Sequence, residues 1–296
     1  MNTNSNRQNG HNDLSLRMLG TGGPWVNPER FGPSNLVSIG DERLLFDSGR
    51  GANIRLAQAG ESSSRISTIF LTHHHLDHIS DLADIMITSW LQGRRQELVI
   101  YGPLGTQKIV TALLETVYAK DINWRSDGEP AWGGWKPVRA VDLVPGDEVE
   151  TENWKVSCAS VVHGHGLGFS PKFLEQWQCF GYRIESMGKI ITLSGDTVDC
   201  DGIRKLACNA DLLVQCCFAS DAEVAGDPHL ETVGKETLAT ASGAATIAEF
   251  CNVKHMAINH LRPKGQDRLE EIRNEIKAIY SGKLTVGEDL LMIPIS

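Results

Sequence analysis

The chain has 296 residues, 41% of them hydrophobic, which is enough for one sizeable core. With 28 basic against 37 acidic side chains the net charge is −9, and no run of Lys or Arg exceeds two residues. Because nucleic-acid-binding surfaces are usually basic, this balance argues against nucleic acid as a partner. No apolar stretch has the length of a membrane span, so no membrane partner is expected.

Residues 1–13 are polar and rich in Asn, and they predict a disordered tail rather than a signal peptide or an anchor. Residues 14–296 are predicted to form a single domain. The seven cysteines form no C-x-x-C pair and fall mostly in apolar surroundings. This usage indicates reduced thiols in a cytoplasmic protein.

Short apolar runs alternate with amphipathic or glycine-punctuated segments along the chain. The apolar runs predict strands at residues 14–19, 36–39, 44–46, 66–71, 98–101, 156–162, 179–184, 190–193, 212–216, 256–258 and 290–293. The amphipathic segments predict helices at residues 52–59, 82–91, 106–119, 232–250 and 269–280. A Trp-rich insertion at residues 121–137 is predicted to be irregular. This order is mixed α/β (α+β), without the strict alternation of a doubly wound sheet.

Four candidate metal ligands stand within six residues directly after one of the apolar strands. Alternate residues of an extended backbone point to one face, so His73 and His75 can converge on a single ion. The following turn brings Asp77 and His78 towards a neighbouring ion. The pattern therefore predicts two metal sites, with a chance cluster of polar loop residues as the alternative. His74 points to the opposite face and is predicted to be a packing residue.

Three further strand ends carry a His or an Asp that can complete the two sites. His163 is the first histidine after its strand and is the predicted ligand, with His165 as the alternative. Asp196 follows an apolar strand behind a glycine that allows a sharp turn. His260 ends another strand. His255, which precedes that strand, is predicted to be a surface or capping residue.

These motifs, in this order, resemble the metallo-β-lactamase fold superfamily, most closely its ribonuclease Z and arylsulfatase-like branch. The resemblance covers nearly the whole chain, and its segments besides the metal loop are Leu19-Gly20-Thr21-Gly22-Gly23-Pro24, Leu45-Phe46-Asp47-Ser48-Gly49, Tyr101-Gly102-Pro103-Leu104-Gly105-Thr106, Ser194-Gly195-Asp196-Thr197 and Asn259-His260-Leu261. It implies a four-layer αβ/βα metallo-β-lactamase sandwich with the metals at one edge.

The resemblance also implies seven ligands for two zinc ions: His73, His75 and His163 for one, Asp77, His78 and His260 for the other, and Asp196 between them. Imidazoles and carboxylates suit zinc, and no cysteine falls at a ligand position. Asp47 would orient a ligand histidine, with a turn residue as the alternative. His229, just before a long helix, would lie close to the reacting group, although the residues before it are also helix-start signals.

Two zinc ions would hold a hydroxide that is nucleophilic at neutral pH. Asp77 would orient it and accept its proton, and His229 would donate a hydrogen bond or a proton to the oxyanion or leaving group. The chain departs from ribonuclease Z at Gln215-Cys216, where those enzymes carry a His-Glu pair. Neither residue here supplies the carboxylate that would hold the catalytic histidine.

Two aromatic segments are predicted to border the metal edge: Trp124, Trp132 and Trp135 in one, and Phe169, Phe173 and Trp177 in the other. They predict a lid over an apolar or aromatic substrate, with a homodimer interface or a local mini-core as the alternative. The expected function is a zinc-dependent metallo-hydrolase of a small substrate, acting on a phosphoester, sulfoester, lactone or related bond or removing an aryl substituent. The alternatives are a ribonuclease Z-like tRNA 3′-end endonuclease, an iron oxidoreductase and a silent metal-binding protein.

Overall fold

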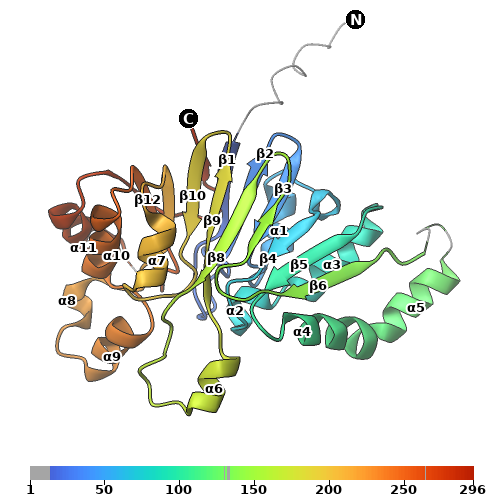
Figure 1. The fold of residues 1–296 in the computed structure, drawn as a ribbon, viewed down its shortest axis with the longest axis horizontal. Helices are drawn as coiled ribbons and strands as arrows, with labels where there is room; N and C mark the ends of the chain where they lie inside the picture. The colour runs from blue at the N-terminus through green and yellow to red at the C-terminus, as the bar shows by residue number, and fades with distance from the viewer. Residues whose placement is uncertain (1–13, 130, 132–133, 264) are drawn as a thin grey trace, which may run out of the picture.

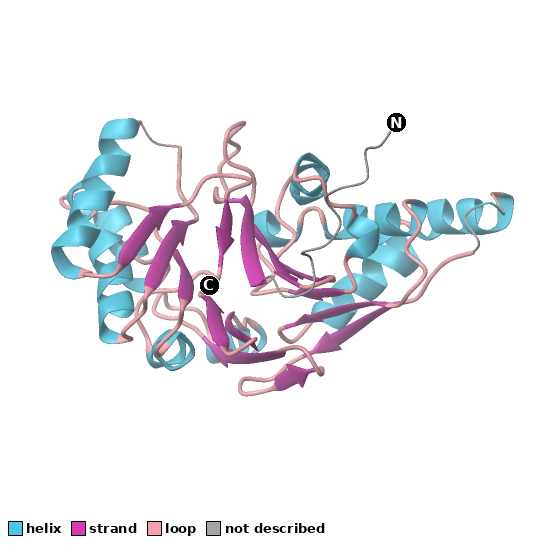
Figure 2. Cartoon of the chain, turned by 90° about the horizontal axis from the view of Figure 1, so that it is seen from above, coloured by secondary structure: helices cyan, strands magenta, loops and turns pink. Residues whose placement is uncertain are grey.

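The computed structural model describes residues 14–129, 131, 134–263 and 265–296. The expected tail at residues 1–13 and Trp132 lie outside the described residues. Two seven-stranded sheets face each other in the middle of the molecule, and helices cover their outer faces (Figures 1 and 2). The predicted fold class, an α/β sandwich of four layers, is confirmed.

The first sheet has the strand order β14-β1-β2-β3-β4-β5-β6. Its strands are β1 (Leu14–Gly20), β2 (Ser34–Ile39), β3 (Glu42–Phe46), β4 (Thr68–Phe70), β5 (Leu98–Gly102), β6 (Val138–Asp142) and β14 (Met292–Pro294). Strands β3 to β6 run parallel to one another, whereas β14, β1, β2 and β3 pair antiparallel. Its outer face packs against α1 (Ala52–Gln58), α3 (Leu82–Leu91) and α4 (Thr106–Ala112).

The second sheet has the order β13-β12-β11-β10-β9-β8-β7. Its strands are β7 (Glu148–Glu150), β8 (Lys155–Ser160), β9 (Phe180–Ser186), β10 (Lys189–Leu193), β11 (Leu212–Cys216), β12 (His255–Asn259) and β13 (Lys283–Val286). Strands β10 to β13 are parallel, as expected for strands buried on both faces. The outer face packs against α7 (Asp201–Ala207), α10 (Ala241–Phe250) and α11 (Gln266–Ile279).

Alternation along the strands builds three layers of apolar side chains. In β11, Leu212 and Val214 face the other sheet, whereas Leu213 between them faces the helices. On the opposite sheet Phe70 faces inward and Ile69 faces outward. The central layer is thus shared by both sheets and fixes the position of the strand ends that carry the candidate ligands.

The remaining helices lie in the connections: α2 (Leu76–Ile79), α5 (Ala119–Gly128), α6 (Pro171–Gln176), α8 (Asp221–Val224), α9 (Pro228–Glu236) and the short turns η1 (Ser63–Arg65) and η2 (Leu113–Val117). Two predicted helices are therefore wrong in extent. The helix at 106–119 ends in the π-turn η2, and the one at 232–250 is divided into α9 and α10. That break has a local cause, since the Ala239 N–H donates to Thr197 O and the Thr240 side chain caps α10.

Two further expectations are corrected. The insertion at 121–137 is not wholly irregular, since α5 runs to Gly128. His255 lies inside β12, where its ring contacts the Thr285 hydroxyl at 2.8 Å. No helix in the described ranges is long and apolar enough to cross a membrane. All seven cysteines are free thiols.

Candidate metal centre

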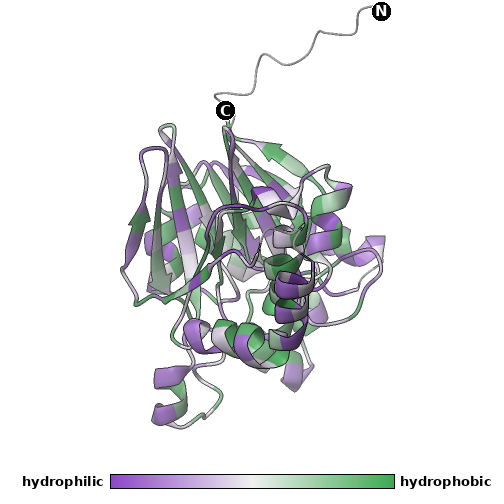
Figure 3. Ribbon diagram, turned by 90° about the vertical axis from the view of Figure 1, so that its right-hand side faces the viewer, coloured by the Kyte–Doolittle hydropathy of each residue, from purple (hydrophilic) through white to green (hydrophobic). Residues whose placement is uncertain are grey.

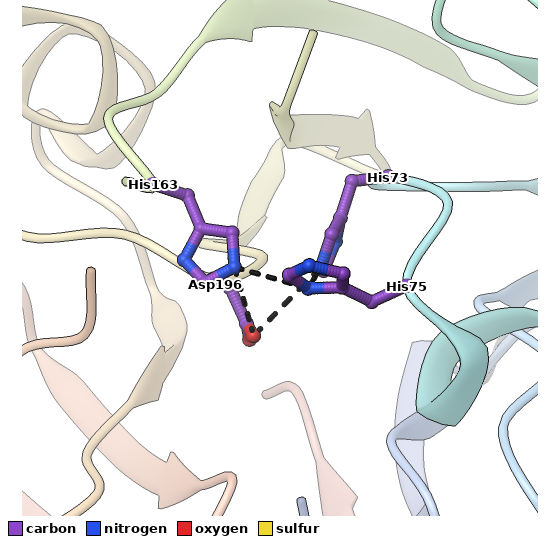
Figure 4. Close-up of side chains that lie close together, drawn as sticks. All are labelled: His73, His75, His163 and Asp196. Atoms are coloured by element: carbon purple, nitrogen blue, oxygen red, sulfur yellow. Dashed lines mark hydrogen bonds and ion pairs between the residues drawn. The ribbon is translucent and has the colours of Figure 1, made fainter. Parts of the chain in front are cut away.

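Side chains from four strand ends meet at one end of the two sheets. They form two groups whose potential ligand atoms lie within 4.8 Å of one another: His73, His75, His163 and Asp196 in the first, and Asp77, His78 and His260 in the second. All seven predicted ligands are thus brought together, and Figure 4 shows the first group converging. All of them except His75 are buried.

The first group has the spacing of a metal site. His75 Nδ1 lies 2.9 Å from His73 Nε2 and 3.1 Å from His163 Nε2. Asp196 Oδ2 lies 3.8 Å from His73 Nε2 and 3.8 Å from His163 Nε2. Donor atoms at the corners of a tetrahedron with zinc bonds of 2.0–2.1 Å are about 3.3 Å apart, so these side chains need only small adjustments around an ion.

The second group shares Asp196 with the first. Asp196 Oδ2 lies 3.0 Å from His260 Nε2 and 3.4 Å from His78 Nε2. Asp77 Oδ2 closes this group at 3.4 Å from His260 Nε2 and 3.7 Å from His78 Nε2. A single carboxylate oxygen therefore faces both groups, which is the arrangement of a bridging ligand.

Local backbone geometry delivers these ligands. His75 has an extended backbone and is the N-cap of α2, and the first turn of that helix brings Asp77 and His78 inward. Gly195 has φ +60°, and a Cβ there would approach Phe180 O to 2.6 Å, so only glycine fits the turn that presents Asp196. His260 has φ +59°, a conformation that non-glycine residues rarely adopt and that often occurs at functional sites.

Hydrogen bonds fix the orientation of the rings. Asp47 accepts bonds from Thr72 N at 2.8 Å and Thr72 Oγ1 at 2.9 Å, and its Oδ2 lies 2.8 Å from His78 Nδ1. His163 Nδ1 lies 2.7 Å from the Thr237 carbonyl oxygen. Because Nδ1 of His78 and Nδ1 of His163 have these partners, Nε2 of each ring faces the centre. His165 lies beside this group rather than in it, since its Nδ1 accepts the His163 backbone N–H.

The pKa values of the histidines shift in opposite directions in the two groups. Burial lowers the pKa of His73 and His163, so these rings are neutral and offer a lone pair. Burial would also lower the pKa of His260, but Asp196 beside it raises that pKa to about 9. The buried carboxylates of Asp77 and Asp196 therefore favour a positive charge at the centre.

Several buried atoms of the second group make no hydrogen bond within the described residues. They are Asp77 Oδ2, His78 Nε2 and both ring nitrogens of His260. Buried polar atoms almost always have a partner, and unpartnered ones are costly. A cation held between them would satisfy these atoms, so the donor set fits a divalent metal.

Two other predicted residues lie outside the groups. His74 turns away and contacts the Thr106 hydroxyl at 2.8 Å, as a packing residue should. His229 stands on the exposed first turn of α9, whose N-cap Asp227 accepts the His229 backbone N–H. The structure does not place its ring in either group, so its catalytic role stays a prediction.

The departure at Gln215-Cys216 has a structural role. Both side chains are buried, and the Cys216 thiol accepts the Thr197 N–H at 3.3 Å and donates to Thr197 O at 3.2 Å. Cys216 N also donates to Ser194 Oγ at 3.0 Å. Cys216 therefore supports the turn that carries Asp196, and neither residue of the pair supplies a carboxylate.

The two aromatic segments have different positions. Trp135 packs on Trp90 of α3 with ring centroids 5.0 Å apart, and α5, which carries Trp124, lies at the outer end of the first sheet, away from α2 (Figure 1). Trp135 thus belongs to a local mini-core and Trp124 is 62% exposed on α5, so the predicted place of these two side chains at the metal edge is wrong. Trp177 does border the centre, with its ring centroid 4.7 Å from that of His75. The predicted place of the second segment at the metal edge therefore agrees with the structure at Trp177.

Comparisons with known proteins place the chain in a family. The β-lactamase superfamily domain matches residues 42–261. Ribonuclease Z of Mycobacterium bovis is 31% identical over 286 residues, covering 95% of this chain and 98% of the relative. A metallo-β-lactamase-fold protein from Bacillus subtilis has a TM-score of 0.72 at 18% identity, covering 96% of this chain and 99% of that chain. The short form of human tRNase Z has a TM-score of 0.71 at 23% identity, covering 95% and 99%.

These relatives correct two expectations. A small apolar or aromatic substrate was expected, and nucleic acid was not, but proteins that match nearly the whole chain are named ribonuclease Z and tRNase Z. The net charge of −9 is a poor guide to a nucleic-acid partner, because it sums the charges of the whole surface, whereas substrate binding depends on the charges near the site. The chain belongs to the metallo-β-lactamase superfamily, in its ribonuclease Z branch, and is a metal-dependent hydrolase.

Proposed function

We propose that this protein is a zinc-dependent endonuclease that cleaves precursor tRNA at its 3′ end. The observation that carries the proposal is the 31% identity to a ribonuclease Z over 95% of the chain. The seven clustered ligand residues support it, because hydrolysis of a phosphodiester suits a two-metal site.

We assign the metal as two zinc ions per chain. His73, His75 and His163 would hold one, Asp77, His78 and His260 would hold the other, and Asp196, which lies between the two groups, would be shared by them. Five imidazoles and two carboxylates, with no thiol, are a donor set that zinc accepts. Zinc bound there supplies Lewis-acid stabilisation of the phosphate and a water of lowered pKa.

The chain's own residues handle the protons and the orientation. Asp77 has two carboxylate oxygens, so one can bind the metal while the other orients the attacking water and takes up its proton. Asp47, 2.8 Å from His78 Nδ1, would accept the Nδ1–H of that ring, so that Nε2 can bind a metal. His229, exposed to solvent at the start of α9, donates a proton to the leaving oxygen.

A precursor tRNA with a 3′ trailer, labelled at its 5′ end, tests this function. The zinc-loaded protein is expected to release a product of the length of the mature tRNA. Asp196→Asn should abolish the cut, because the side chain shared by both groups loses its negative charge and one of its two oxygens. Asp199→Asn is the matched control, since Asp199 pairs with Arg204 at 2.7 Å and not with the centre. An intact precursor in the presence of zinc-loaded wild-type protein would overturn the proposal.

We further propose that the protein is cytoplasmic and that it forms a homodimer. Free cysteines at seven positions support a reducing compartment. Sedimentation of the zinc-loaded protein measures the oligomeric state directly.

A further inference from the structure

A continuous stack of aromatic rings leads from the metal centre towards solvent. The Trp177 ring lies against His75, with centroids 4.7 Å apart. Phe173 stacks on Trp177 at 5.9 Å with only 14° between the planes, and Phe169 follows at 4.7 Å from Phe173. We call Phe169, Phe173 and Trp177 the aromatic ladder. It starts on a candidate metal ligand, so whatever stacks on it lies next to the reacting group.

Local geometry presents the ladder as one face. Phe173 lies in α6 and Trp177 is the C-cap of this helix, so these two rings, four residues apart, lie on one side of the same helical turn. Phe169 comes just before the N-cap Ser170. The Ser170 side chain caps α6 by accepting the Phe173 N–H at 3.2 Å, and Trp177 N donates to Phe173 O at 2.8 Å. Gly164 and Gly168, both with φ +80°, allow the chain to leave the sheet and return. Figure 3 shows α6 standing clear of the sheets at this end.

The outer part of the ladder is exposed and nearly uncharged. Phe169 and Phe173 are 45% and 42% exposed, although large aromatic side chains are usually buried. Lys172 and Glu175, of opposite sign, are the charged residues of α6. Exposed apolar surface beside a catalytic centre marks a binding site, and this composition suits the faces of rings rather than phosphates.

We propose that the aromatic ladder is a stacking platform for unpaired nucleobases of the RNA strand at the cleavage site. The proposal rests on the proposed function, because it takes RNA as the substrate. A strand whose phosphate lies at the metal centre places a neighbouring nucleotide over Trp177, since that ring contacts His75. Every base has a π-face, so the platform tolerates any sequence but requires bases that are not paired.

Two precursor tRNAs test this platform. They differ only at the trailer nucleotides nearest the cut, which carry normal bases in one and abasic residues in the other. For the precursor with normal bases, Phe173→Ala should raise KM about 10-fold at unchanged zinc content, since stacking on one aromatic side chain is worth that much. Phe173→Tyr should keep KM near the wild-type value. For the abasic precursor, wild type and Phe173→Ala should have the same raised KM.

Phe250→Ala is the matched control, because Phe250 is 67% exposed and packs on Arg204 rather than near the centre. It should leave KM unchanged. If wild type and Phe173→Ala cut the normal precursor with the same KM, the platform is wrong while the proposed function stands. If wild type cuts neither precursor, the proposed function itself has failed. The remaining outcome is that Phe173→Ala converts a dimer to a monomer and that the wild-type protein has the same KM for the normal and the abasic precursor. The aromatic ladder would then bind a second copy of the chain, and the proposal of a stacking platform would be wrong.

Discussion

At the scale of single residues, hydrogen bonds to neighbouring oxygen atoms decide which ring nitrogens of the histidines face the candidate metal centre. Asp47 illustrates this, because it lies outside both groups yet its Oδ2 is 2.8 Å from His78 Nδ1. It is itself fixed by two bonds from Thr72, the residue that precedes His73. One carboxylate therefore orients a ligand of the second group and the backbone that leads into the first.

Asp47→Asn should weaken zinc binding roughly 10- to 100-fold, since it removes the charge that polarises His78 while keeping the side-chain size. Competition with a chromophoric chelator measures the affinity. Asp84→Asn is the matched control, because Asp84 bonds Thr88 and Asn53 on the surface. Equal affinities in all three proteins would show that His78 does not need Asp47.

His229→Ala should lower kcat by ~10²-fold without changing zinc content, because a lost proton donor affects turnover and not ligation. Zinc content and kcat are measured on the same preparation. If zinc falls together with activity, His229 is a ligand or a structural residue, and its assignment as a proton donor is wrong.

At the scale of elements, the sequence predicts best where apolar periodicity is strong. The buried strands β4, β10 and β12 and the candidate ligands at their ends follow from pattern alone. Helix α5 is missed because it is polar and depends on surface ion pairs such as Arg125 with Asp121 at 3.1 Å. The edge strands β6, β7 and β13 are missed because they are short and only partly buried, so their alternation is weak.

The turn after β10 provides a prediction at this scale. Gly195→Ala should destabilise the protein and lower its zinc content, because the new Cβ would lie 2.6 Å from Phe180 O and displace Asp196. Gly188→Ala is the matched control, because Gly188 also has a positive φ, of +70°, but no atom lies within 4 Å of the added Cβ. The control should cost only about 1 kcal/mol for its left-handed backbone. Equal unfolding free energies and zinc contents in the two variants would contradict the role of this turn.

At the scale of the whole molecule, the two groups connect the two sheets. His73 and His75 follow β4 of the first sheet, whereas Asp196 and His260 follow β10 and β12 of the second. Metals held between these groups would cross-link the halves of the sandwich. The substrate was not predictable from the sequence at this scale, because net charge and aromatic content do not specify where on the surface these side chains lie.

Removing zinc should therefore lower Tm by roughly 10 °C, because a ligand at a thousandfold excess over its Kd stabilises a fold by about 4 kcal/mol. Calorimetry with and without chelator measures the shift. Asp196→Asn should show a much smaller shift in Tm on zinc removal, because the side chain shared by both groups is then a neutral amide that binds zinc weakly. Equal Tm values for the wild-type protein with and without zinc would contradict a cross-link between the sheets.

The central claim is that seven clustered residues make this chain a two-zinc RNA endonuclease. Stepwise addition of zinc to metal-free protein, with cleavage of a precursor tRNA followed at every step, tests it most directly. We predict that the cut at the 3′ end of the tRNA body appears with added zinc and reaches its maximum at about two ions per chain. Protein that takes up two zinc ions and leaves the precursor uncut would contradict the account.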